Sequence, residues 1–361
     1  MSQSKYYKVS EVANLVGVSA ETVRRWDKSG KFPSQRHPIN NYRVYSEEQV
    51  VSLLEDLQLT FQYGKKEKEV RASLPSEPVF ESSLGKLYQL DAIKFLQALP
   101  SSSVELIFAD PPYNIRKAEW DSFASQKEYV DWSMEWIKEA HRILSPQGSL
   151  YICGFSEILA DVKWAAAHLF KGCKWLVWYY RNKANLGNDW GRSHESILHF
   201  RKSKQFIFNI DEVRIPYNKH TLKYPVRPQA ESSQYANGKK KKYVWTPHPK
   251  GAKPKDVFEI PTISNSAWEK YPHPTQKPVE LLRKIILASS LEDSTVLDPF
   301  GGSGTTYAVA EAYQRKWLGT ELDSSYCEMI RQRLSDEQHL SRIASGKDEA
   351  EAAQRRAKLR S

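Results

Sequence analysis

The stretch at residues 106–115, LIFADPPYNI, places a carboxylate and an aromatic ring directly after apolar residues that predict a buried strand. Pro111 and Pro112 supply no backbone donor and fix their own dihedral angles, so they make a stiff turn that ends the strand. Asp110 and Tyr113 therefore lie on a rigid corner. The Asp110 carboxylate and a backbone carbonyl of the turn are two acceptors that could bind the hydrogens of an aromatic amino group. This would draw the nitrogen lone pair out of conjugation while Tyr113 stacks on the ring. The candidate catalytic residues are Asp110, Pro111, Pro112 and Tyr113.

A second turn, in STVLDPFGGSGTTYAVAEA, carries glycines between a predicted strand and a helix that should begin close to Ser303. Glycines let the backbone approach a ligand closely, and the free amides of a helix start favour an anion. The next predicted strand ends at Glu321, which lies 321 − 304 = 17 residues after Gly304. Doubly wound nucleotide-binding folds hold ribose hydroxyls with an acidic residue at about this distance. A turn that only packs a helix on a sheet would leave Glu321 unexplained.

The ligand of this second turn should contain a ribose and one small anion. No GxxxxGK[ST] motif follows a predicted strand, which argues against nucleoside triphosphates. S-adenosylmethionine has both groups, since its carboxylate can meet the helix start, and we expect it as the cofactor. Cys153, Cys173 and Cys327 have no paired spacing, so we expect neither a disulfide framework nor a metal site.

Short apolar runs alternate with helical patterns from residue 86 to about residue 202, and again from residue 278. This alternation predicts an α/β domain with a doubly wound, mostly parallel sheet. Such sheets bind ligands at the carboxyl ends of their strands, so Asp110 and the glycine-rich turn can share one cleft. If the aromatic amino group belongs to a nucleic-acid base, the base cannot reach this cleft while it is inside a duplex. Its nucleotide would have to be flipped out of the double helix. The methyl group of S-adenosylmethionine would then pass directly from the cofactor sulfur to the amino nitrogen of the base.

The net charge of +10 is concentrated in one segment of the 361 residues. Residues 201–271 contain 15 Lys and Arg against 6 Asp and Glu, or 15 − 6 = +9. Interleaved tyrosines and a tryptophan make this the composition of a polyanion-binding segment. For the run GKKKKY, which contains Lys239, Lys240, Lys241 and Lys242, a solvated lysine-rich loop is an equally good interpretation.

Residues 1–60 are predicted to form a separate small domain. VSEVANLVGVSAETVRRW reads as two short helices around a glycine-containing turn, and YRVYSEEQV follows as a strand and a helix. These residues resemble the MerR-like family of winged helix-turn-helix domains. The resemblance implies that Thr22, Arg24 and Arg25 lie on a recognition helix and Arg43 on the wing, facing DNA. A generic helical interaction or dimerisation module is the alternative.

Four motifs in a fixed order characterise the rest of the chain: DPPYN, a basic insert, HPTQKP at residues 273–278, and DPFGGSGTT. Over about residues 86–334 they resemble the DNA amino-methyltransferases of restriction-modification systems, in the motif order of the beta class. The resemblance implies a Rossmann-like S-adenosylmethionine-dependent methyltransferase fold with permuted motif order, joined to an all-α winged helix-turn-helix domain. It also implies that the insert at 203–268 recognises the target sequence.

The same resemblance assigns roles to individual residues. Asp91 would hold the adenine of the cofactor and Glu321 its ribose, although the family usually has glycine where this chain has Leu90. The remaining cofactor contacts would come from Asp110, Thr275, Gln276, Lys277, Asp298, Phe300, Gly302, Ser303, Gly304 and Thr305. His194 and Glu195 fall on a strand expected below the flipped base and receive no catalytic step.

The same motifs bear on several alternative activities. Methylation of cytosine carbon uses a cysteine in a Pro-Cys pair, which is missing here. An aspartate opening the DPPY motif favours the 6-amino group of adenine, with the 4-amino group of cytosine as the alternative. Glutamine amides as substrate and RNA as substrate fit less well. The alternative from another class is a DNA-binding transcription regulator with a vestigial methyltransferase fold.

The predicted organisation is a helix-turn-helix domain at 1–60, a linker at 61–85, a methyltransferase domain at 86–335 and a charged tail at 336–361. The expected partners are duplex DNA and a cognate restriction endonuclease, with the chain a monomer or homodimer. No apolar run is long enough to span a membrane and no leader is recognisable, so we expect a cytoplasmic protein of a bacterium or archaeon.

Overall fold

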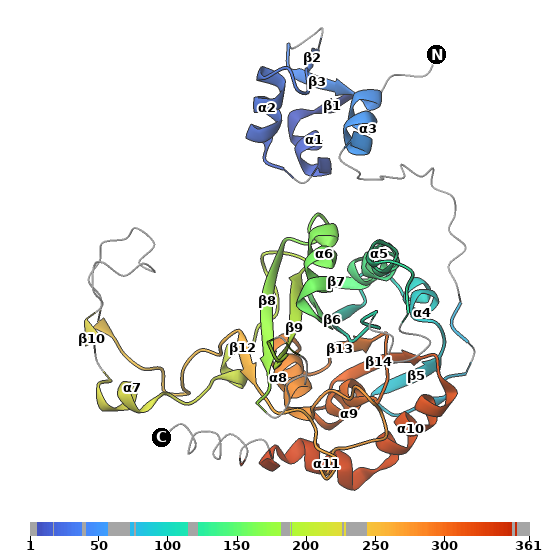
Figure 1. Cartoon of the computed structure of the whole chain (residues 1–361), viewed down its shortest axis with the longest axis vertical. Coiled ribbons are helices and arrows are strands. Elements are labelled where there is room, and N and C mark those ends of the chain that lie inside the picture. The colour runs from blue at the N-terminus through green and yellow to red at the C-terminus, as the bar shows by residue number, and fades with distance from the viewer. Residues whose placement is uncertain are drawn as a thin grey trace. The chain divides into compact units, whose positions relative to one another are not determined.

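The structure, a computed structural model, describes residues 6–16, 18–37, 41–56, 73–75, 77–114, 122–181, 188, 190–225, 227–228, 244–348 and 351. The chain divides into two compact units, Met1–Val70 and Arg71–Ser361, called here the N-terminal and C-terminal units (Figure 1).

The N-terminal unit combines three helices with a small antiparallel sheet of strand order β1-β3-β2. Val12, Val23 and Tyr45 lie at the centre of its core, each without exposed surface. Ser19 caps the second helix by accepting a hydrogen bond from the amide of Thr22. The elements are β1 (Tyr6–Lys8), α1 (Val9–Val16), α2 (Ala20–Lys28), β2 (Gln35–Arg36), β3 (Arg43–Ser46) and α3 (Glu47–Asp56).

The expectation of an all-α N-terminal domain is therefore too simple. The sequence indicated only the strand at β3, because β1 and β2 are three and two residues long and show no readable alternation. β1 pairs with β3 from Tyr6↔Ser46 to Lys8↔Val44. This pairing ties the start of the domain to its wing.

The C-terminal unit is built on a sheet of nine described strands in the order β12-β8-β9-β7-β6-β13-β14-β5-β4. The strands are β4 (Phe80–Glu81), β5 (Gly85–Gln89), β6 (Val104–Ala109), β7 (Leu144–Gly154), β8 (Gly172–Tyr179), β9 (His194–Arg201), β12 (Val257–Glu259), β13 (Thr295–Asp298) and β14 (Lys316–Glu321). The helices are α4 (Ala92–Ala98), α5 (Gln126–Ile143), α6 (Ser156–Ala166), α7 (Lys219–Lys223), α8 (Val279–Ser289), α9 (Thr305–Ala312), α10 (Ser324–Ser335) and α11 (Glu337–Ser345). A short pair, β10 (Arg227–Pro228) and β11 (Val244–Trp245), lies in the insert.

Parallel pairing links β5, β14, β13, β6 and β7, while β9 runs antiparallel to both β7 and β8. The predicted doubly wound, mostly parallel sheet is thus confirmed. Helices cover both faces, with α4, α5 and α6 on one side and α8, α9, α10 and α11 on the other (Figure 1).

Two-residue periodicity divides the strand side chains between these two layers. In β6, Leu106 and Phe108 belong to the core under α8 to α11, whereas Ile107 and Ala109 belong to the core under α4 to α6. β13 and β14 alternate in the same way. Because both faces are covered, the central strand β6 is apolar at every position except Glu105, which is typical of parallel sheets.

Three expected boundaries differ from the structure. The segment expected as a linker to residue 85 already contains β4, which pairs with β5 at the sheet edge. The expected charged tail from residue 336 contains α11, which buries His339 and Ile343 against the domain. The expected insert at 203–268 includes β12, which extends the main sheet by pairing with β8. Each of these pieces has too few apolar residues to give a sequence signal.

None of the helices in the described ranges is long and apolar enough to cross a membrane.

Candidate active site

The carboxyl ends of β6, β13, β14 and β5 meet at one edge of the sheet, because these neighbouring strands are parallel. Asp110 follows β6, Asp298 ends β13 and Glu321 ends β14. A cavity of about 520 Å³ lies at this edge. Its volume falls within the range of about 300 to 1,000 Å³ that is usual for small-molecule sites.

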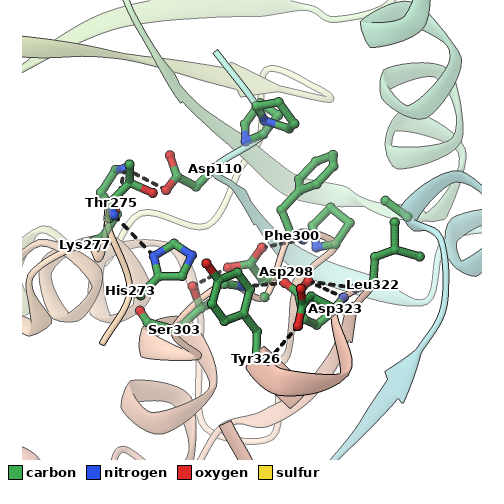
Figure 2. A pocket seen from close by; sticks show the side chains of 18 of the residues that line it. Asp110, His273, Thr275, Lys277, Asp298, Phe300, Ser303, Leu322, Asp323 and Tyr326 are labelled. Carbon is green, nitrogen blue, oxygen red and sulfur yellow. Dashed lines mark hydrogen bonds and ion pairs between the residues drawn. The ribbon is translucent and has the colours of Figure 1, made fainter. Parts of the chain in front are cut away.

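This cavity is lined by nearly all the residues that the sequence predicted for catalysis and cofactor binding. Asp110 and Lys277 lie on one side of it, and Leu322 and Asp323 on the other, with Asp298 and Phe300 between them (Figure 2). The predicted residues in its lining are Asp91, Asp110, Pro111, Pro112, Tyr113, Thr275, Gln276, Lys277, Asp298, Phe300, Gly302, Ser303, Thr305 and Glu321.

Four polar side chains form a largely buried cluster around Asp110. The Tyr113 hydroxyl lies 2.6 Å from Asp110 Oδ1 and 3.0 Å from Glu195 Oε2. Lys277 Nζ donates to Asp110 Oδ2 at 2.6 Å and lies 3.6 Å from Glu195 Oε2. One phenol and one ammonium therefore bridge two carboxylates.

Glu195 reaches this edge because β9 is antiparallel to its neighbours. The start of β9 lies beside the carboxyl ends of β7 and β8, with Ser196 opposite Gly154 and His194 opposite Tyr179. Glu195 was recognised from the sequence without a role. Its distance of 85 residues from Asp110 (195 − 110) gave no indication that the two carboxylates meet.

The cluster controls the ionisation of its own members. Burial alone would lower the pKa of Lys277, but the nearby carboxylates of Asp110 and Glu195 reverse this effect and raise that pKa above its usual value. Burial, reinforced by the same two carboxylates, raises the pKa of Tyr113 well above its usual value. At neutral pH the cluster therefore contains an ammonium and an intact phenol.

Neutral side chains lie beside these charges. Burial raises the pKa of the Cys153 thiol well above its usual value, so no thiolate forms next to the cluster. Burial lowers the pKa of His273 to about 4, so this imidazole is neutral, and its Nδ1 accepts the amide of Thr275 at 3.3 Å. His273 was not among the predicted site residues, although it opens the HPTQKP motif.

Asp298 organises the glycine-rich turn from below. Its carboxylate accepts the Phe300 amide at 3.0 Å and the Thr306 hydroxyl at 2.5 Å. Only 3% of its surface is exposed. The side chain thus holds the turn in shape, whether or not it also contacts a ligand.

Gly304 differs from the expectation that it lines the site. It precedes α9 in the left-handed region at φ 69°, and a Cβ there would lie 2.9 Å from Ile330 Cγ1. Its amide bonds the Gly301 carbonyl at 2.8 Å, and it is outside the cavity lining. The structure therefore needs glycine here for the backbone turn and for close packing on α10.

Glu321 is fixed by backbone donors at the end of β14. Its Oε2 accepts the Gly302 amide at 2.7 Å, and its Oε1 accepts the amides of Leu322 and Asp323 at 2.8 and 2.9 Å. A carboxylate oxygen can accept two donors, so Oε2 keeps capacity for a ligand hydroxyl.

Two further predicted cofactor residues are partly engaged by the protein itself. Asp91 caps α4, with Oδ1 accepting the amides of Ile93 and Lys94 at 3.1 Å each. The side-chain amide of Gln276 bonds the backbone of its own loop. Both side chains therefore hold backbone in place at the rim of the cavity.

Sequence reasoning missed four aromatic residues of the lining, namely Phe108, Phe123, Trp132 and Tyr326. Phe123 and Trp132 line the cavity, with ring centroids 5.2 Å apart, and the Trp132 ring lies 5.9 Å from that of Phe300. Neither residue belongs to a motif, and Trp132 on α5 has the spacing of an ordinary core position. The three rings together form an aromatic wall.

The predicted DNA-facing residues of the N-terminal unit have different environments. Arg24 pairs with Glu21 at 3.1 Å on the exposed face of α2, and Arg25 is exposed on the same helix. Thr22 bonds Ser19 at the helix start.

Arg43 Nε lies 2.5 Å from Asp27 Oδ2, so the expected wing arginine also joins β3 to the end of α2. Lys239, Lys240, Lys241 and Lys242 lie outside the described residues.

Comparison with known families gives two matches. A family model described as DNA methylase matches residues 104–332, and one described as MerR family regulatory protein matches residues 8–45. The DNA adenine methyltransferase YhdJ of Escherichia coli is 37% identical over 255 residues, covering 70% of this chain and 83% of its own length. The type II methyltransferase M.HpaI of Haemophilus parainfluenzae is 34% identical over 252 residues, covering 68% and 73%.

Among solved structures, a cytosine-N4-specific PvuII DNA methyltransferase superposes with a TM-score of 0.56 at 20% identity. The match covers 76% of this chain and 96% of that chain. At this identity the likeness concerns the fold alone.

Proposed function

Because the chain belongs to the DNA methylase family, we propose that it transfers a methyl group from S-adenosylmethionine to the 6-amino group of adenine in duplex DNA. The observation that carries this proposal is the position of Asp110 on a proline-fixed corner of the same cavity that contains the glycine-rich turn and Glu321. This places an acceptor for an amino group beside features that suit a nucleoside with an anionic tail.

The cavity residues fit S-adenosylmethionine, the methyl donor of this family. Glu321 offers a carboxylate oxygen to ribose hydroxyls, and the loop from Gly302 to Thr305 offers a helix start to a carboxylate. Phe123, Trp132 and Phe300 supply aromatic walls for a purine. When bound, this cofactor supplies an electrophilic methyl group.

The protein's contribution to chemistry is placement and charge. Asp110 and the carbonyl of the Pro111–Pro112 turn accept the amino hydrogens, which localises the lone pair on the nitrogen. The nitrogen gains the methyl carbon and gives up one proton, for which the Asp110 carboxylate is the adjacent acceptor. Lys277 and Tyr113 hold that carboxylate in one orientation, so little reorganisation is needed at the moment of transfer.

Adenine is proposed over cytosine because an aspartate opens the motif and because the E. coli relative is named for adenine. The two bases present the same donor and acceptor pattern at this edge, so the 4-amino group of cytosine is the alternative. The test is to incubate the protein with labelled S-adenosylmethionine and mixed-sequence duplex DNA, and to identify the labelled nucleoside by mass spectrometry. Label in methyladenine is expected, whereas label on the cytosine amino group would overturn the base assignment.

No transfer to DNA, with cofactor binding intact, would instead favour RNA as substrate or a regulator that has lost its chemistry. Transfer confined to one sequence would support a site-specific modification enzyme paired with a restriction endonuclease.

Tyr113 is proposed to stack on the flipped base. Its ring packs edge-on against Phe155 at 5.1 Å and lines the cavity. We expect Tyr113→Ala to weaken capture of the target base by about tenfold or more, because stacking on an aromatic ring contributes about 1 to 3 kcal/mol. Tyr113→Phe keeps the ring and should retain most of the affinity. The fluorescence of 2-aminopurine at the target position measures capture, and equal losses in both variants would contradict the stacking role.

The N-terminal unit is proposed to bind DNA through α2. Arg25→Ala should weaken binding of the full-length protein to duplex DNA and reduce the slope of log affinity against log salt by about one, as expected for one lost phosphate contact. Arg24→Ala is the comparison variant, and its slope shows whether the second predicted arginine, which pairs with Glu21, also contacts phosphate. Filter binding over a salt series measures both, and an unchanged slope for Arg25→Ala would remove this residue from the interface.

A further inference from the structure

A buried arginine lies directly behind the glycine-rich turn. Arg333, on α10, has no exposed surface. Its Nη1 donates to the Ser303 carbonyl and to the Thr305 hydroxyl, both at 2.9 Å, and its Nε donates to His339 Nε2 at 3.2 Å. Every one of these acceptors is uncharged, because burial lowers the pKa of His339 to about 4.

The positive charge of Arg333 has no counter-ion among the described residues. Its Nη2 is buried without a hydrogen-bond partner, and no described carboxylate forms an ion pair with it. Burial lowers the pKa of Arg333, Tyr271 and then Glu269 raise it by less, and the carboxylate of Glu269 accepts the amide of Val279 at 2.7 Å. The resulting pKa of about 10 leaves the group charged at neutral pH.

A buried cation without a partner is costly, and removing one member of a buried pair normally destabilises a protein strongly. The Tyr271 ring, 4.7 Å from the guanidinium carbon, offsets part of this cost. The remaining charge faces the turn, whose other side is the cavity, since both Ser303 and Thr305 line it. An anion bound there would complete the pair.

We propose that Arg333 is a positioning residue that makes this end of the cavity selective for a carboxylate, namely the amino-acid end of the cofactor. Its positive charge attracts the ligand carboxylate across Ser303 and Thr305, and its side chain does not touch the ligand. This inference rests on the proposed function for the identity of the ligand. The competing role is purely structural, in which Arg333 only joins α10, α11 and the turn.

The test compares two ligands of nearly the same shape, S-adenosylhomocysteine and its carboxamide, of which only the first carries the negative charge. Calorimetry on the full-length protein should give at least about tenfold tighter binding of the acid, because a cation separated from the ligand only by the turn acts through a medium of low dielectric constant. No preference for the acid in the unaltered protein would overturn the proposal without any variant.

Arg333→Met should abolish most of this preference, weakening the acid by about tenfold and the carboxamide by less than about threefold. Arg333→Lys keeps the charge and should keep the preference, even where thermal unfolding shows lower stability.

A purely structural role predicts that Arg333→Met weakens both ligands equally, and this outcome would overturn the proposal. If Arg333→Met does not fold, Arg333→Gln takes its place, since it is uncharged and can still bond the Ser303 carbonyl. If neither neutral variant folds, the test relies on the two ligands with the unaltered protein and with Arg333→Lys. Loss of the preference for the acid in Arg333→Lys, which keeps the charge, would contradict the proposal. Binding of the acid without DNA methylation would fail the proposed function and leave this inference standing.

Discussion

Asp110→Ala should reduce methyl transfer by about a thousandfold or more while leaving cofactor affinity within about threefold. In the proposed mechanism the carboxylate is the acceptor that localises the lone pair of the target nitrogen, and the backbone carbonyl of the turn cannot do this alone. The change should be tolerated by the fold, because Lys277 Nζ keeps Glu195 Oε2 at 3.6 Å as a counter-charge. Single-turnover methylation and calorimetry with S-adenosylhomocysteine measure the two effects separately.

Asp110→Asn is the matched variant, since it preserves shape and one acceptor oxygen but loses the charge. We expect the methylation rate of Asp110→Asn to lie between the rates of Asp110→Ala and the unaltered protein, and its cofactor affinity to be unchanged. If either variant lost cofactor affinity in proportion to its loss of rate, Asp110 would be a cofactor-binding residue, and the proposed transfer mechanism would need another acceptor.

The fold of the C-terminal unit could be predicted because its strands are buried on both faces and end in readable turns. The run from Val104 to Ala109 is apolar at every position except Glu105, and the stiff prolines that follow mark its end. The glycine-rich turn could be predicted for a similar reason. The φ values of 51° at Gly302 and 69° at Gly304 favour glycine, and glycines are easily recognised in a sequence. Local chemistry was therefore visible in the sequence.

Contacts between distant segments were not visible. Asp110, Glu195 and Lys277 meet through the antiparallel course of β9 and the loop before α8, and no spacing rule connects them. Lys277 was expected as a cofactor contact, yet its ammonium bonds the Asp110 carboxylate. Arg333 and α11 lie in a segment with a charged composition, where burial depends on the surface that receives the helix.

Lys277→Met is the second change with a large expected effect. It leaves two largely buried carboxylates around one phenol, and like charges at this separation cannot both remain ionised. One of them should then hold a proton at neutral pH. We expect the methylation rate at pH 7 to fall by about a hundredfold and to recover partly at alkaline pH, so that the acidic limb of the rate profile moves upward by about a unit or more.

The free energy of unfolding of Lys277→Met should be lower than that of the unaltered protein, and it should depend on pH. Removing one partner from a buried ion pair costs about 3 to 5 kcal/mol of unfolding free energy. The folded variant would keep a proton that the unfolded chain releases, so its stability should decrease as the pH rises through the neutral range. In the unaltered protein the raised pKa of Lys277 means that its contribution persists through neutral pH and is lost only in strongly alkaline solution.

The double variant Lys277→Met with Glu195→Gln separates this account from a simple loss of packing. It removes one positive and one negative charge, leaving Asp110 as the only carboxylate on the Tyr113 hydroxyl. Stability should recover by about half or more of the single-variant loss, and the acidic limb should return toward its original position. Urea unfolding and single-turnover rates over a pH series give both quantities. Additive losses in the double variant would show that Lys277 acts on Asp110 without the participation of Glu195.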